Sequence, residues 1–226
     1  MAAFPRFLIP LGLLLSFSPV HAFEQEVSPH GARLRWRTPA LTWRADVSLS
    51  SLSPDAEAAV TAGFQAWATP PCTSLRFAVT SDAPVVVRVV TEGWPFDASL
   101  VAHTNVDADP NSGEIRGATL LLNGTYRFST TLPPPKDAVD LQSVVLHEVG
   151  HVLGLRHTGH RASVMYGGFK LGSPAQRNLQ PDDVTAVCTL YPAPPADPSP
   201  RAVLLPSLIV LALLVVWSVR ASEPRR

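Results

Sequence analysis

The sequence predicts an α+β fold, in which a β-sheet is combined with three main helices. Short apolar runs, some alternating and some continuous, fill much of the first half of the chain and are typical of strands. Helix start signals or apolar faces mark residues 53–68, 136–153 and 181–191. The 226 residues suit one such domain with appendages. The 18 basic and 18 acidic residues balance one another, which argues against a nucleic-acid partner.

The first helix has the clearest start signal in the chain. Before it, residues 35–44 alternate between apolar and polar side chains, as a strand does. Ser53 is expected as the N-cap and Pro54 as the first helical residue, with acidic residues in the first turn. The helix is expected to run to about Ala68, shortly before two prolines.

Four further strands are expected at residues 75–79, 85–90, 100–103 and 115–123. The second of them is a valine-rich run that suits a buried position in a parallel sheet. A single helix between the early strands predicts a right-handed crossover connection.

The strongest chemical signal lies at the end of the second helix. His147 and His151 are four residues apart, so a helix aims both imidazoles at one point, as a tetrahedral zinc site requires. Glu148 lies beside the first ligand, where a carboxylate can act as a general base on a zinc-bound water. Gly154 suits a left-handed turn that ends the helix, and His157 then supplies a third nitrogen. Three protein ligands leave one position open, which is typical of a catalytic zinc.

Met165 follows His157 by eight residues, within the sequence Ser-Val-Met-Tyr. The pattern HExxHxxGxxH followed by such a methionine resembles the metzincin metallopeptidases, and the Ser-Val-Met-Tyr form is most similar to their matrixin branch. The resemblance implies a twisted mixed sheet with an edge strand over the cleft, and a zinc site between two subdomains. It also implies that Met165 forms an apolar floor under the three histidines; on periodicity alone it would be an ordinary core residue. His160 is a rival third ligand, but the glycine-turn spacing favours His157.

The resemblance also assigns residues to substrate binding. It places the edge strand at Val101, Ala102 and His103, where an extended polypeptide would add as a further strand. Tyr166 and the four residues after it are expected to line the specificity pocket. His103 matches a structural-zinc ligand of the family as well, but its expected partner near Arg116 is not a histidine, so a second zinc is not expected.

The predicted function is that of a zinc-dependent endopeptidase, a monomer that acts on extended polypeptides with Glu148 as the general base. Three alternatives stay open: a zinc-binding surface module without turnover, a surface protein whose zinc only supports folding, and a hydrolase of cell-wall peptides. Calcium is a second candidate cofactor, because residues 107–114 carry alternating oxygen side chains, as the start of a calcium loop does. A plain hairpin turn explains that pattern equally well.

The N-terminal end predicts export. Residues 1–22 have one charge, Arg6, an apolar stretch and a small residue at the end, which is typical of a secretory signal peptide. Cleavage there would leave Phe23 first, in a short segment of residues 23–35 before a catalytic domain of residues 36–191. The alternative is a membrane helix.

The C-terminal end predicts an anchor. Residues 192–201 form a proline-rich, semi-rigid linker. Residues 202–219 contain no charge and reach the lower length limit of a transmembrane helix. Residues 220–226 form a basic, cytoplasmic tail, which places the catalytic domain on the extracellular or periplasmic face. The alternative is a sorting tag that is later removed.

The chain has two cysteines, Cys72 after the first helix and Cys188 in the last. In an exported protein such a pair usually forms a disulfide, which here would tie the two subdomains together. The alternative is two buried free thiols.

Overall fold

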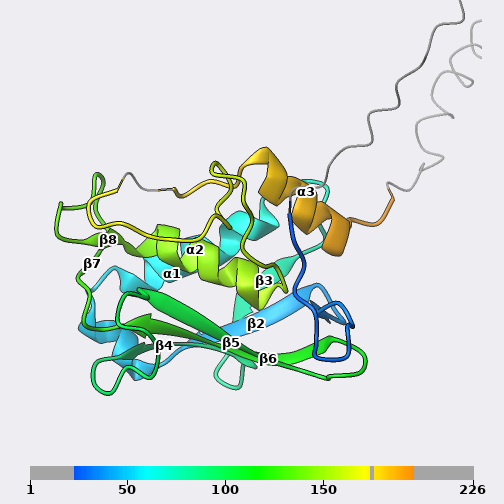
Figure 1. The fold of residues 1–226 in the computed structure, drawn as a ribbon, viewed down its shortest axis with the longest axis horizontal. Helices are drawn as coiled ribbons and strands as arrows, with labels where there is room; N and C mark the ends of the chain where they lie inside the picture. Colours follow the sequence, from blue (N-terminus) through cyan, green and yellow to red (C-terminus); the bar gives the residue numbers. More distant parts are fainter. Residues whose placement is uncertain (1–22, 174–175, 196–226) are drawn as a thin grey trace, which may run out of the picture. The chain divides into compact units, whose positions relative to one another are not determined.

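A computed structural model describes residues 23–173 and 176–195, which contain three α-helices and a six-stranded mixed sheet (Figure 1). The predicted fold class is therefore confirmed. The predicted signal peptide, membrane anchor and basic tail lie outside the described residues. Among the helices of the described part of the chain, none combines the length and the apolar character that a membrane crossing demands.

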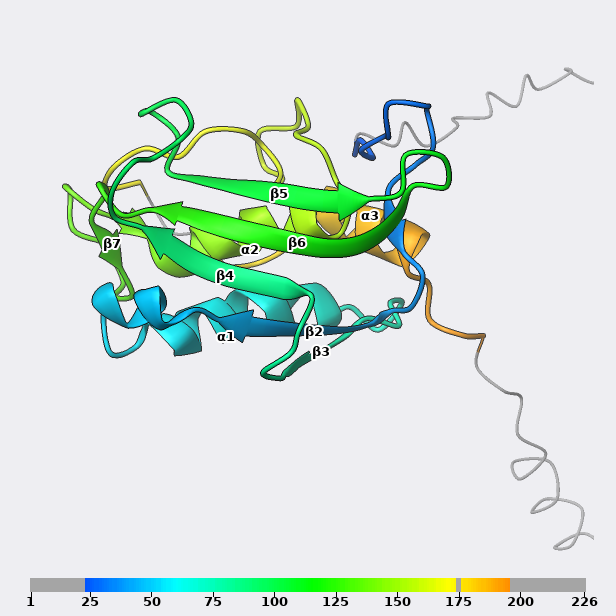
Figure 2. The ribbon, with the colours of Figure 1, turned by 90° about the horizontal axis from the view of Figure 1, so that it is seen from below.

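The main sheet follows the order β1-β6-β4-β2-β3, with all of these pairs parallel. β5 pairs with β6 outside this path and is the one antiparallel neighbour, and Figure 2 shows it at the edge of the sheet. The strands are β1 (Arg35–Trp36), β2 (Ala40–Ala45), β3 (Arg76–Val79), β4 (Val85–Val90), β5 (Ala102–Ala108) and β6 (Glu114–Asn123), with a separate pair β7 (Phe128–Ser129) and β8 (Val139–Asp140).

The helices α1 (Ala56–Ala68) and α2 (Leu141–Val152) pack on one face of this sheet (Figures 1 and 2). A short 3-10 helix η1 (Val47–Ser51) precedes α1, and α3 (Pro181–Leu190) follows much later in the chain. The core lies between sheet and helices, where the rings of Trp43 and Phe64 stack with centroids 4.8 Å apart. Trp67 donates a hydrogen bond from Nε1 to the Leu146 carbonyl at 2.8 Å, which locks α1 to α2.

The valine-rich strand is where the sequence placed it. β4 spans Val85–Val90 and runs parallel between β2 and β6, with Val85 and Val87 fully buried. The predicted strand at residues 35–44, by contrast, is two strands. β1 pairs with β6 and β2 pairs with β3 and β4, so the chain changes neighbours around Pro39, which has no amide hydrogen to donate.

Two predicted helix starts are wrong. α1 begins at Ala56 rather than Pro54, because Ser53 to Ala56 form a turn first and the Ser53 hydroxyl caps nothing. The second helix begins at Leu141 rather than at residue 136, because residues 139–140 pair with β7 as strand β8. Asp140 is its N-cap, and its carboxylate accepts a hydrogen bond from the Ser143 amide at 2.9 Å. The last helix begins at Pro181, as expected.

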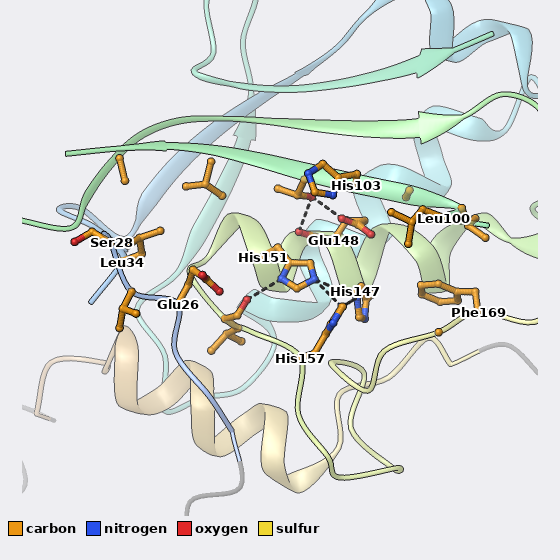
Figure 3. A pocket seen from close by; sticks show the side chains of 18 of the residues that line it. Glu26, Ser28, Leu34, Leu100, His103, His147, Glu148, His151, His157 and Phe169 are labelled. Atoms are coloured by element: carbon orange, nitrogen blue, oxygen red, sulfur yellow. Dashed lines mark hydrogen bonds between the residues drawn. The ribbon is translucent and has the colours of Figure 1, made fainter. Parts of the chain in front are cut away.

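The fold divides at the end of α2. Residues 35–152 contain the sheet, α1 and α2, and we call them the upper region. Residues 153–193 are the lower region. The two names follow the orientation of Figure 3, in which the sheet is at the top. In the described part of the lower region the one α-helix is α3. A disulfide joins Cys72 in the upper region to Cys188 on α3.

Candidate active site

The three predicted metal ligands converge. The Nε2 atoms of His147 and His157 are 3.1 Å apart, and that of His151 is 3.2 Å from each of them (Figure 3). Three nitrogens at ~2.1 Å from one tetrahedral zinc would stand ~3.4 Å apart, so the observed triangle fits such an ion. His160 is exposed and is not in this group.

The second ring nitrogen, Nδ1, of both histidines on α2 contacts a backbone carbonyl. His147 Nδ1 lies 2.6 Å from the Val164 oxygen, and His151 Nδ1 lies 2.8 Å from the Leu155 oxygen. Because a carbonyl can only accept, each Nδ1 carries the proton and each Nε2 turns a lone pair toward the common point. Burial lowers the pKa of His147 to about 3 and that of His151 to about 4, so both rings are neutral at pH 7, as metal ligands must be.

A glycine turn brings the third histidine back. Gly154 has a φ of +90°, and a Cβ at this position would lie 2.3 Å from the Leu34 carbonyl oxygen. Glycine is therefore required both by the left-handed backbone and by the close approach. The turn is also paired with the N-terminal segment: the Glu26 amide donates to the Gly154 carbonyl, and the Arg156 amide donates to the Glu24 carbonyl, both at 2.8 Å. No pattern in the sequence predicted this pairing.

Met165 is buried against α2, on a turn that α3 supports. Its role as a floor under the three histidines stays a prediction. Gly150 on α2 faces it so closely that an added Cβ would lie 2.2 Å from the Met165 Sδ. The buried carboxylate of Asp183 accepts hydrogen bonds from the Ser163 hydroxyl at 2.5 Å and the Val164 amide at 3.0 Å. Asp183 therefore fixes the turn whose carbonyl holds His147. The sequence marked it only as an acid in the first turn of a helix.

Glu148 is almost fully buried next to the three imidazoles, at 4% exposure. Burial raises its pKa to about 7, and a hydrogen bond from Thr104 opposes that rise. The Thr104 hydroxyl is 2.6 Å from Glu148 Oε2. A carboxyl group with a pKa near neutrality can both accept and return a proton. Thr104 was not among the predicted site residues, because its contact joins positions 44 residues apart.

The histidines open into a cleft of about 690 Å³ beside the edge strand β5 (Figure 3). Val101, Ala102 and His103 line it together with Glu148 and the N-terminal segment from Glu26 to Pro29, and their role in substrate binding stays a prediction. The strand predicted at residues 100–103 is β5, which spans Ala102–Ala108. It extends beyond His103 because its residues up to Ala108 pair with β6. Tyr166 lies instead on an adjoining cavity of about 170 Å³, beside Ser143 and Lys170.

His103 takes part in an aromatic cluster rather than a metal group. Its ring is tilted against that of Phe96 with centroids 4.0 Å apart, and Phe96 meets Trp94 edge-on at 5.2 Å between centroids. Among the described residues, His147, His151 and His157 form the one cluster of histidine, cysteine or acidic side chains that could hold an ion.

In the predicted calcium loop, the carboxylate of Asp109 already has partners within the protein. One carboxylate oxygen of Asp109 accepts hydrogen bonds from the amides of Asn111 and Ser112 at 2.9 Å. The other oxygen pairs with Arg116 at 2.6 Å. These contacts favour the hairpin turn, and calcium stays a prediction.

This combination of an α+β fold and three converging imidazoles after a glycine turn is that of the metzincins. Within that class the chain belongs to the matrixin family, whose sequence profile matches residues 35–192.

Several curated proteins are similar to it. A protein described as "Probable matrix metalloproteinase 095L", from Invertebrate iridescent virus 3, is 34% identical over 51% of this chain and 31% of its own length. "Stromelysin-1" from Equus caballus is 30% identical over 73% of this chain and 34% of its own. "Metalloendoproteinase 4-MMP" from Arabidopsis thaliana is 38% identical over 44% of this chain and 28% of its own length. The chain thus spans about a third of the length of these relatives.

Proposed function

We propose that this protein is a zinc-dependent endopeptidase that hydrolyses peptide bonds in extended polypeptides. The observation that carries the proposal is the triangle of Nε2 atoms with the buried Glu148 carboxylate beside it. When bound, zinc supplies a Lewis acid that polarises the scissile carbonyl and makes water a stronger acid. The membership in the matrixin family supports the same reaction.

Glu148 supplies the proton transfer. Thr104 occupies its Oε2 atom, so Oε1 is the atom that accepts a proton from the attacking water. With a pKa near 7, the carboxyl can then return that proton to the nitrogen of the leaving amine. His147 and His151 stay neutral and would act as metal ligands through Nε2, with no proton to give at those atoms. His157 would supply the third Nε2, and its partial burial lowers its pKa as well.

The edge strand supplies the binding of the polypeptide. Within the described residues β5 pairs with β6 along one side, and its other side borders the cleft. An extended peptide added there would form backbone hydrogen bonds without demanding a chain end, which supports endopeptidase activity. The cavity beside Tyr166 is proposed to receive a substrate side chain.

The test uses two substitutions, one that should leave zinc binding unchanged and one that should weaken it. Glu148→Ala should abolish cleavage of a peptide library while one zinc per chain stays bound. His157→Ala should lower the affinity for zinc and abolish cleavage together. If the Glu148→Ala variant still cleaved at the wild-type rate, the assigned role of Glu148 would be wrong. Loss of zinc from that variant would point instead to Glu148 as a structural element of the site.

We also propose that the protein is exported and tethered to the membrane. The support is the sequence pattern alone: residues 1–22 for export and residues 202–219 for the anchor. N-terminal sequencing of the mature protein should give Phe23. Membrane fractionation should find the full chain, and not a version ending at Tyr191, in the membrane pellet.

A further inference from the structure

We propose that Thr104 is a positioning residue that holds the Glu148 carboxylate in one orientation, and so links the substrate-binding strand to the general base. The inference rests on the proposed function for its catalytic meaning. Its geometric basis, a 2.6 Å hydrogen bond from the Thr104 hydroxyl to Glu148 Oε2, does not depend on that function.

The distance identifies the bond as a strong one. Hydroxyl donors reach carboxylates at ~2.5–2.7 Å when the acceptor is ionised, and such bonds are about twice as strong as neutral ones. The Thr104 hydroxyl also lies 3.3 Å from the backbone oxygen of Glu148. Since a hydroxyl has one proton to donate, the shorter contact to the carboxylate takes it.

The position of Thr104 on β5 explains why this residue can reach the base. Thr104 pairs with Leu120 on β6, so its backbone is fixed in the sheet. Successive side chains of a strand point to opposite faces. His103 accordingly contacts the ring of Phe96, whereas Thr104 faces α2 and contacts Glu148. Of the residues on this face, Ala102 and Val106 carry no hydrogen-bond donor in their side chains.

The consequence for the reaction is one of orientation. With Oε2 held from the strand side, the carboxylate cannot rotate freely about its last torsion, which is otherwise broad. Oε1 would therefore keep one position relative to the imidazole triangle. A peptide that adds to β5 would bind to the same strand that carries Thr104. Thr104 would therefore fix the position of the Glu148 carboxylate relative to the bound peptide.

The experiment compares three variants of the full chain loaded with zinc. Thr104→Val keeps the size of the side chain and removes the hydroxyl, and Thr104→Ser restores the hydroxyl. Thr119→Val is the matched control, since Thr119 lies on the neighbouring strand opposite Asn105. The measurements are kcat and KM on one peptide, zinc content, the melting temperature, and the dissociation constant of acetohydroxamate, which chelates zinc and offers a proton to a correctly placed carboxylate.

Thr104→Val should lower kcat about 10- to 100-fold with KM changed less than about threefold. It should weaken acetohydroxamate about tenfold at unchanged zinc content. Thr104→Ser should restore both values to within about threefold, and Thr119→Val should leave them as in the wild type.

Two results would overturn the inference. Wild-type kcat and acetohydroxamate binding in Thr104→Val would show that the hydrogen bond orients nothing. A raised KM at unchanged kcat would show that Thr104 binds substrate instead. If the wild-type protein itself cleaved no peptide, the proposed function would fail, while the acetohydroxamate measurement would still decide the position of Glu148.

Discussion

The upper and lower regions reach a fixed shape by different means. The upper region is a sheet covered by two helices, and its core is continuous, with Trp43, Phe64 and Val85 almost fully buried. The lower region has one α-helix among its described residues, and it adds buried side chains such as Leu155 and Val187 to the same core. Its irregular part is held in addition by single polar contacts, such as those of Asp183 with Ser163 and Val164.

The metal site lies where these two kinds of structure meet. His147 and His151 come from α2, whose geometry sets their separation. His157 comes from an irregular loop, and its position depends on the Gly154 turn and the N-terminal segment. The ligand set is therefore as stable as the links that join the lower region to the upper one. Three such links can be broken separately.

The disulfide should be the strongest link. Replacing Cys72 and Cys188 by serine should lower the free energy of unfolding by about 4–5 kcal/mol, because the bond closes a loop of 116 residues and restricts the unfolded chain. Equilibrium unfolding in urea measures the change, and chemical reduction of the wild type should reproduce it. A loss below about 1 kcal/mol would mean that the polar contacts hold the lower region unaided.

The buried ion pair between Arg177 and Asp140 should come second. Arg177 reaches from the lower region to the N-cap of α2, whose carboxylate is 2% exposed. Arg177→Met should cost about 3 kcal/mol at pH 7, since it leaves that carboxylate buried without its partner. The control is Arg116→Met, which breaks an exposed pair with Asp109 and should cost less than about 1 kcal/mol.

The pH dependence of the Arg177 effect follows from the pKa of Asp140. Burial raises that pKa, but hydrogen bonds from Arg177 and Ser143 outweigh it and hold the value below the ordinary 3.8. A pKa that is lower in the folded state gives stability that is present above the unfolded value and is lost as the pH falls through the folded one. The difference between wild type and Arg177→Met should therefore shrink below about pH 4. A constant difference down to pH 2 would contradict an ionic origin.

The contrast between the regions also explains what the sequence could predict. The bounds of β4 were predicted to the residue, because its signal is a valine-rich run contained in six consecutive positions. The ligand set was predicted because HExxHxxGxxH is local in the chain. Asp183 and Thr104 were missed, because their partners are 20 and 44 residues away and no periodic pattern marks a long-range hydrogen bond. The start of α2 was misplaced because residues 139–140 pair with β7, and the two-residue strands of this pair are too short to show an alternating pattern.

The third link, the packing of Met165 against Gly150, should have the smallest effect. Gly150→Ala places a Cβ 2.2 Å from the Met165 Sδ and 3.1 Å from Trp67, so the thioether must move within a buried site. Alanine is a better helix former than glycine by about 1 kcal/mol, which acts in the opposite direction. We expect overpacking to dominate and the free energy of unfolding to fall by about 1–2 kcal/mol.

A second background makes the Gly150 experiment specific to the contact between regions. Met165→Ala removes the side chain that the new methyl group would meet. In that background Gly150→Ala should be neutral or stabilising, because the remaining contact of 3.1 Å with Trp67 requires only a small shift. The gain in helix propensity and the partial filling of the cavity by the methyl group both act in its favour. The sign of the Gly150 effect should therefore reverse between the two backgrounds in urea unfolding of the metal-free protein. An equal loss in both would mean that α2 itself, and not its contact with the lower region, requires glycine at this position.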